Sequence, residues 1–399
     1  MHRGLMLLRA IVSCVLAAAA LRAQTASPAQ AVIETGFQHF YNMEFDQALE
    51  QYVAASKLKP DSADIYNHIG QAILYREMLR SGALESELVT GRNPFYRREK
   101  MNPSAADEKQ FLDSIHRAGE ISKARIAANA RDAEAHYLLG VTLGLRANYG
   151  FLVRKSYVDS LRDATAARAE HKRATDIDPN FIDAQLIQGV YDYMVGSLHW
   201  AYRMLGFLTG FHGDRARGTQ TLEMVAEKGK QNRSDAKVAL CAIYRRERDP
   251  QKAIPLLTGL IQQYPRNYLF RMELVQMYGD AGDKDNGLAV IEEMYRLKRA
   301  NAPGFERLPE EKIRFTRGTL LFWYNDLEPA LEDMKAVTAK ADALDLNTAV
   351  YSWLRLGQIY DLMGRHNAAI MSYNRTMNYG PKSDAADEAM SYVANPYHR

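Results

Sequence analysis

The sequence predicts an all-α protein, an α-solenoid of about eight stacked helical hairpins that ends in a short capping helix. Two observations lead to this prediction. Residues 350–383 carry a small residue at Gly357 and a helix-ending Pro381 at the spacing that two closely crossing helices require. Gly36 and Gly70 are separated by 34 residues, the length of one such hairpin repeat. No stretch of the chain forms a convincing strand pattern.

The first unit spans residues 29–62. A hairpin of helices A and B needs small side chains where the two backbones approach, large ones where hairpins interlock, and a stop after helix B. The unit meets these needs with Gly36, Phe45, Ala48, Tyr52, Ala55 and Pro60. This pattern resembles the tetratricopeptide repeat, and the resemblance covers most of residues 29–383. It implies a scaffold fold that builds a binding surface more readily than an active site.

The following units are recognised by the same small residues. Helix A of the second unit begins near Ala63, and the third and fourth units contain Gly140 and Gly189. In the fifth unit, residues 234–267, Cys241 takes the place of the close-packing glycine. The remaining predicted elements are a sixth unit at 268–302, a seventh around Gly318, an eighth at 350–383 and a capping helix with a tail at 384–399.

Three insertions interrupt this spacing, near residues 79–105, 146–160 and 196–212, each between helices A and B of units two to four. Equivalent turns of a solenoid line one edge, so we expect the insertions to lie together. They combine aromatic and basic residues, and we name Arg97, Arg98, Arg154 and Trp200 as candidate contacts. Such side chains can bind carboxylates, phosphates, sugars or peptide groups. Alternatively, the aromatic rings fill the solenoid wall and the charges are merely solvated.

The N-terminus predicts export. Residues 1–23 combine a basic start, an apolar run from Ala10 to Leu21 and a small residue before cleavage, as in a secretory signal peptide, and residues 24–28 form a linker. The apolar run is too short to span a bilayer. A lipid anchor on Cys14 is a less favoured alternative. We therefore expect a periplasmic or secreted protein.

Charge and cysteine content narrow the possible partners. Removing residues 1–23 leaves 48 basic and 48 acidic residues, so composition gives no reason to expect nucleic-acid binding. Membrane association is possible through the apolar stretch 197–211, but a basic stripe that would favour it is missing. Cys241 is the one cysteine left, which excludes an intramolecular disulfide.

The concave groove supplies the main candidate site. In such superhelices, fixed positions of helix A face the concave side. Counting along the units gives Phe37, Phe40, Tyr41, Asn67, Gln71, Tyr75, Arg245, Arg246, Phe322 and Trp323 as partner-binding residues. Their mixture suits an extended peptide or an amphipathic helix. The Lys and Asn set with which chaperone-binding repeat proteins hold a terminal carboxylate is absent from these positions.

Residues 206–215, with the sequence GFLTGFHGDR, together with Gly218, Leu222 and Tyr264 resemble a segment of the tetratricopeptide-repeat thirty-nine family, which includes fungal inclusion-body clearance proteins. The resemblance covers residues 198–278 and implies the same interrupted helical scaffold. Those relatives are intracellular and lack a secretory signal, so their biology is not carried over to this chain.

We find no catalytic, metal or cofactor motif. The histidines are scattered, no paired Cys/His spacing occurs, and no glycine-rich phosphate loop follows a strand. The sequence thus favours a non-catalytic exported scaffold that binds a protein or peptide through its groove or insertion edge. The alternative is a small-ligand or glycan binder that uses the Arg/aromatic insertions, and an enzyme with an unrecognised site is a third hypothesis.

Overall fold

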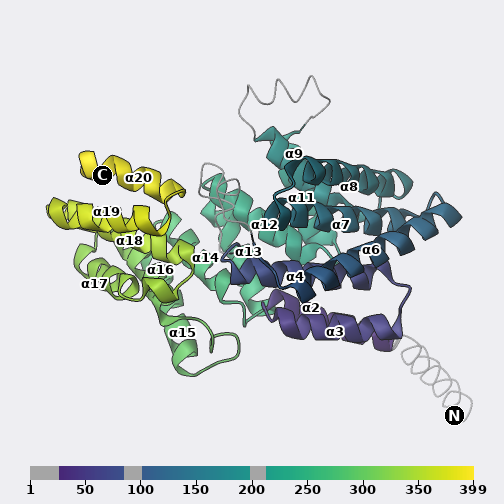
Figure 1. Ribbon diagram of the computed structural model, residues 1–399, viewed down its shortest axis with the longest axis horizontal. Coiled ribbons are helices and arrows are strands. Elements are labelled where there is room, and N and C mark those ends of the chain that lie inside the picture. The colour runs from purple at the N-terminus through teal and green to yellow at the C-terminus, as the bar shows by residue number, and fades with distance from the viewer. Residues whose placement is uncertain (1–26, 85–100, 198–212) are drawn as a thin grey trace, which may run out of the picture.

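The computed structural model describes residues 27–84, 101–197 and 213–399, and every regular element within these ranges is helical. The path of the chain is shown in Figure 1. The helices are α2 (Pro28–Tyr41), α3 (Phe45–Leu58), α4 (Ala63–Arg80), α6 (Ala105–Ala128), α7 (Ala133–Tyr149), α8 (Tyr157–Ile177), α9 (Leu186–Gly196), α11 (Arg215–Lys228), α12 (Arg233–Arg246), α13 (Pro250–Gln263), α14 (Tyr268–Asp280), α15 (Lys284–Arg299), α16 (Glu310–Trp323), α17 (Leu327–Thr338), α18 (Leu346–Leu362), α19 (His366–Tyr379) and α20 (Asp384–Ala394).

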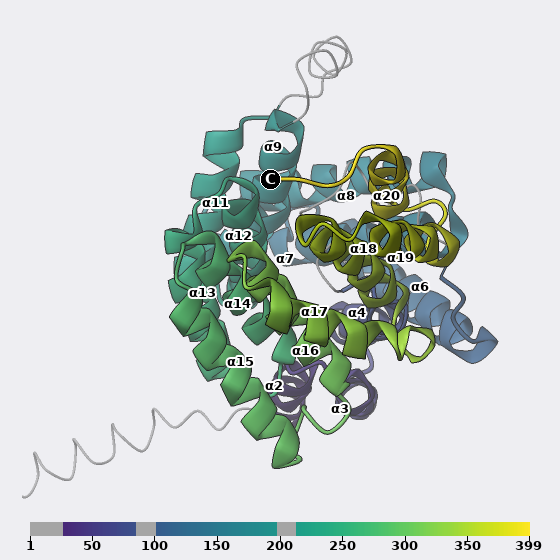
Figure 2. The ribbon, with the colours of Figure 1, turned by 90° about the vertical axis from the view of Figure 1, so that its left-hand side faces the viewer.

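Consecutive helices pack as hairpins. The pairs are α2/α3, α4/α6, α7/α8, α9/α11, α12/α13, α14/α15, α16/α17 and α18/α19. Each pair also packs on the next, and Figure 2 shows the pairs following a curved path. The all-α solenoid predicted from the sequence is therefore confirmed, and α20 packs on the last pair at the predicted capping position.

Glycine positions explain how closely the two helices of a hairpin cross. A Cβ atom at Gly36 would overlap the ring of Tyr52, and one at Gly357 would overlap the ring of Tyr373. Both tyrosine rings are buried in the core. The glycine and the tyrosine ring therefore contact each other where the two helices cross, and this contact occurs in the first and in the last hairpin.

The turns between helices A and B share one backbone feature. A residue with positive φ stands at the fifteenth position of five predicted units, and only glycine adopts this conformation freely. These residues are Met43, Arg248, Gly282, Asn325 and Gly364. The repeat period is thus visible in the backbone as well as in the packing.

The second predicted insertion is largely helical. Helix α7 continues to Tyr149, a π-helical turn spans Gly150–Arg154, and α8 begins at Tyr157. Lys155 ends the π turn with a left-handed backbone at φ 55°. The extra residues therefore lengthen the hairpin instead of forming a separate loop.

Candidate partner-binding site

The first hairpin contacts the fifth across the curve of the stack. The Arg266 guanidinium donates to both carboxylate oxygens of Glu44, at 2.6 and 2.8 Å. The Arg266 backbone N–H donates to Asn42 Oδ1 at 2.9 Å. Asn267 Nδ2 donates to the Tyr41 carbonyl at 2.8 Å, and the rings of Tyr41 and Tyr264 stack at 4.8 Å. The first five hairpins therefore close into a ring, which the repeat pattern did not predict.

The predicted groove residues of the N-terminal hairpins divide into two groups. Phe37, Tyr41, Gln71 and Tyr75 are partly exposed. The Phe37 ring meets the His68 ring edge-on at 4.7 Å, so α2 and α4 present these side chains together.

Phe40 and Asn67 belong to the second group, and their assignment as partner-binding residues is corrected. Phe40 is 5% exposed and lies in the apolar core with Phe45 and Tyr75. Asn67 is 1% exposed; its amide donates to the Leu138 carbonyl at 3.0 Å and accepts from the Thr142 hydroxyl at 2.9 Å. The burial of these two residues could not be predicted from their positions within one repeat, because helix A of the next hairpin covers both side chains.

Titratable side chains from four hairpins influence one another inside the ring. Burial raises the pKa of the Asp235 carboxyl to about 6, although the Tyr41 hydroxyl donates to it. Burial disfavours charged His68, but Asp64, 3.1 Å away, outweighs that effect and raises the pKa of His68. Burial raises the pKa of the Tyr137 hydroxyl, and the nearby carboxyl groups of Asp64 and Asp235 raise it further. The hydrogen bond from Tyr41 of α2 to Asp235 of α12 therefore adds to the contacts between the first and fifth hairpins.

Arg245 and Arg246 differ in availability. Arg245 Nη1 pairs with Glu273 at 2.8 Å, and both side chains are largely buried. Arg245 therefore already has its acidic partner within the chain. Arg246 is exposed, with its guanidinium 5.9 Å from the centre of the Tyr193 ring.

Phe322 and Trp323 end helix α16 in contrasting positions. Phe322 is fully buried, so it cannot present its surface to a partner, and its assignment is also corrected. Trp323 is 52% exposed, and its ring meets that of Phe322 edge-on at 5.1 Å. An exposed tryptophan resting on a buried aromatic ring has the features of an interface hot spot.

Residues 395–399 lie against this part of the stack. The Tyr397 backbone N–H donates to Asp361 at 2.8 Å, and the Tyr397 ring lies 6.0 Å from that of Phe322. The Arg399 side chain donates to the Phe322 carbonyl and to Asn325. The segment after the capping helix thus forms one wall of the surface around Trp323.

Arg355 is the residue of this surface that the sequence analysis missed. It stands on α18, with its guanidinium carbon 4.2 Å from the centre of the Phe322 ring and 4.8 Å from that of Trp323. The signal in the sequence was an arginine between Leu354 and Leu356, two buried apolar residues of helix A in the eighth unit. We call Trp323, Arg355 and Arg399, which lie against the buried Phe322 ring, the Trp323 surface.

The insertion edge is only partly described. Arg97, Arg98 and Trp200 lie outside the described residues. Arg154 pairs with Glu108 at 3.2 Å, and the Met101 backbone N–H donates to the Leu152 carbonyl at 3.4 Å. The end of the first insertion and the helix that follows it therefore contact the second insertion.

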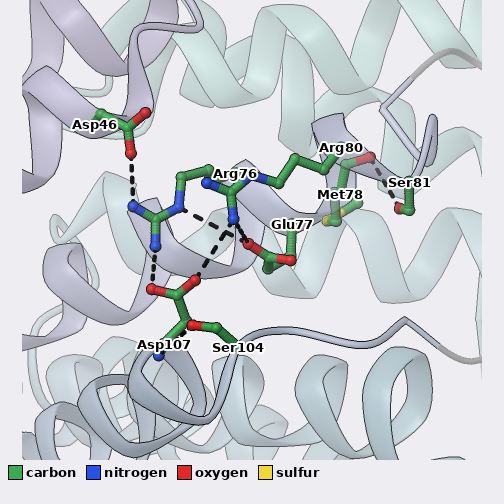
Figure 3. A network of polar contacts seen from close by, with 8 residues as sticks. All are labelled: Asp46, Arg76, Glu77, Met78, Arg80, Ser81, Ser104 and Asp107. Carbon is green, nitrogen blue, oxygen red and sulfur yellow. Dashed lines mark hydrogen bonds and ion pairs between the residues drawn. The ribbon is translucent and has the colours of Figure 1, made fainter.

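Arg76 anchors the return of the first insertion (Figure 3). Its guanidinium binds Asp46 of α3 at 2.6 Å and Asp107 of α6 at 2.5 Å. Ser104 caps α6 by accepting from the Asp107 backbone N–H at 3.1 Å. These basic contacts are internal, so nothing among them favours a ligand at this edge over a structural role.

Cys241 and the possible metal-ligating side chains bear on whether the described residues hold a reactive site. Cys241 is buried, and burial raises the pKa of its thiol to about 12, which keeps it protonated and unreactive. Within the described ranges, no group of His, Cys, Asp and Glu is arranged to hold a metal ion. No helix in the same ranges has both the length and the apolar character needed to cross a membrane.

A family model described as TPR repeat matches residues 40–74. The match runs from the end of α2 through α3 into α4. Residues 40–74 are thus similar to a tetratricopeptide repeat, and stacked helical hairpins continue beyond them in the described residues.

Two solved structures are similar to it. The crystal structure of yeast Tom70 has 12% identity and a TM-score of 0.38, with 92% of this chain and 95% of that chain covered. The human IFIT1 dimer with PPP-AAAA has 13% identity and a TM-score of 0.43, with 89% and 78% covered. No curated protein matches this chain. The resemblance of residues 198–278 to the thirty-nine family therefore stays a resemblance.

Proposed function

We propose that this chain is an exported, non-catalytic scaffold that binds a protein partner on the inner face of its helix stack, at the Trp323 surface. One observation carries the proposal: a half-exposed tryptophan stands on a helix A, with two guanidinium groups near its ring and a buried aromatic ring beside it. Aromatic and arginine side chains dominate the binding energy of protein interfaces. Tetratricopeptide repeats commonly serve as protein-binding scaffolds.

Export is the second part of the proposal. It rests on the basic start and apolar run of residues 1–23. Expression of the full chain, followed by N-terminal sequencing of the protein recovered outside the cytoplasm, tests it. A new N-terminus near residue 24 supports export, and an intact, cytoplasmic Met1 would refute it.

The binding part is tested by affinity capture from envelope extracts with purified protein. Trp323→Ala removes the exposed ring, and we expect it to reduce the amount of captured partner about tenfold or more. Met371→Ala is the matched control, because Met371 is 72% exposed on α19, a helix B. Equal loss in both variants, or loss in neither, would refute binding at the Trp323 surface.

A further inference from the structure

Arg355 carries a charge that forms no ion pair with a carboxylate of the described residues, although Glu388 is near enough to favour that charge. Its Nη1 donates to the side-chain oxygen of Gln358 at 2.8 Å, while its Nε has no hydrogen-bond partner. Burial lowers the pKa of the guanidinium to about 10. Buried charges are normally paired, so an arginine left in this state calls for an anion from outside.

A second guanidinium converges on the same rings. Arg399 lies 4.6 Å from the centre of the Phe322 ring and 6.0 Å from that of Trp323, where Arg355 already stands at 4.2 and 4.8 Å. The charge of Arg399 disfavours that of Arg355. An anion bound beside both would relieve this repulsion and accept hydrogen bonds from the unused N–H groups.

The surroundings favour a single carboxylate over a polyanion. Glu388 is close enough to influence Arg355, and Asp361 holds the Tyr397 backbone. A nucleic acid needs a row of basic residues along its phosphates, and here two arginines are flanked by acidic groups. Trp323 adds an exposed apolar face beside the charges. An acidic side chain within an otherwise apolar peptide fits this combination.

We propose that the Trp323 surface binds an acidic residue of the partner, with Arg355 and Arg399 holding its carboxylate and Trp323 packing against an adjoining apolar side chain. The inference rests on the proposed function and narrows it to acidic–apolar peptide segments. The site differs from the Lys and Asn set of the chaperone-binding repeats, whose positions carry other residues in this chain.

The test uses the full chain and two pools of blocked nonapeptides. Both pools have apolar residues around the centre; one has a central Glu and the other a central Gln. We expect calorimetry to give a Kd about tenfold lower for the Glu pool. We expect Arg355→Met, which keeps the contact with the two rings, to abolish that difference.

Arg375→Met is the matched control, since Arg375 also lies over a tryptophan, 6.0 Å from the Trp353 ring centre, but on helix B. Arg375→Met should leave the difference in affinity between the two peptide pools unchanged.

If Arg355→Met fails to fold, Arg399→Met and the comparison of the Glu and Gln pools on the unaltered protein still test the proposal. Equal affinity for both pools, or tighter binding of inorganic phosphate or a single-stranded RNA, would overturn the proposal. If Trp323→Ala loses the captured partner but the two peptide pools bind with equal affinity, recognition of an acidic residue is refuted and the proposed scaffold function is still supported.

Discussion

At the scale of single residues, the hairpins depend on glycines that admit a neighbouring ring. Gly36 and Gly357 stand where a Cβ atom would overlap Tyr52 and Tyr373. Interiors packed at crystal-like density have no room for an added methyl group at such points. The position of these glycines was predictable from the sequence because a small residue recurs at the same position of most of the predicted repeats.

Gly357→Ala is predicted to destabilise the protein by about 1–3 kcal/mol, because the methyl group forces the buried Tyr373 ring to move. Gly259→Ala is the matched control. Gly259 lies inside α13 with no heavy atom within 4 Å of an added Cβ, so the change should be neutral or stabilise by about 0.5–1 kcal/mol. Urea unfolding gives the free energy of unfolding of both variants. Equal changes in that free energy would contradict the packing explanation.

His171 gives a residue-scale prediction of pH dependence. Its side chain is 1% exposed, its Nδ1 has no partner, and burial lowers the pKa to about 4. Between the unfolded pKa of about 6.5 and pH 4, the unfolded chain binds the proton more readily, so stability falls as the pH falls. We expect His171 to lower the free energy of unfolding by about 2 kcal/mol between pH 7 and pH 5.

Comparison of urea unfolding at the two pH values tests this expectation. His171→Leu should lose less stability on acidification than the unaltered protein does. His116, whose side chain is 75% exposed, provides the control, and His116→Leu should lose as much as the unaltered protein. A His171→Leu variant with an unchanged pH response would exclude His171 as the titrating group.

At the scale of elements, the hairpins were predictable and their closure was not. The capping helix predicted within residues 384–399 corresponds to α20, because a repeat stack must cover its last apolar face. The contact of Arg266 with Glu44 joins residues far apart in the sequence. No repeat template contains it, since it depends on the accumulated curvature of five hairpins, three of them interrupted.

Arg355 was missed for a related reason. The groove positions come from counting within one unit, whereas its partly buried state comes from Phe322 of the preceding unit and the segment after the cap. The same counting placed Phe40, Asn67 and Phe322 on the surface, although neighbouring hairpins cover them. Local periodicity predicts which helix face is turned inward, and only packing shows which side chains remain open there.

Ring closure is tested by Arg266→Met, which removes the pair with Glu44 and the restraint on the end of α2. We expect faster amide hydrogen exchange in α2 and α3, by about tenfold. Arg299→Met is the control, because Arg299 and its partner Glu292 are both about two-thirds exposed and such pairs contribute little. Unchanged exchange in α2 would mean that closure does not stabilise the first hairpin.

The capping helix provides a second element-scale prediction. Ala389 is fully buried in a cluster with Val350, Leu354 and Tyr373. Ala389→Asp places a charge there and should detach α20, which we expect to speed proteolysis of α18 and α19. The neighbouring Met390 is 63% exposed, so Met390→Asp should leave the digestion pattern unchanged. Identical digestion of the two variants would contradict the capping role.

At the scale of the whole molecule, the stack has two parts with different properties. The first five hairpins close on themselves, and buried titratable groups from several of them interact with one another. The last two hairpins present an exposed tryptophan and an arginine without an acidic partner among the described residues. We infer that the ring gives rigidity and that the C-terminal part meets the partner.

Site-specific photocrosslinking tests this account most directly. A photoreactive phenylalanine analogue placed at Trp323 should crosslink a defined protein in envelope extracts, and excess of the Glu-centred peptide pool should compete with it. The same analogue at Met371, exposed on helix B of the last hairpin, should give no such product. An identical product at both positions, or none at Trp323, would contradict the claim that the inner face of the C-terminal hairpins binds the partner.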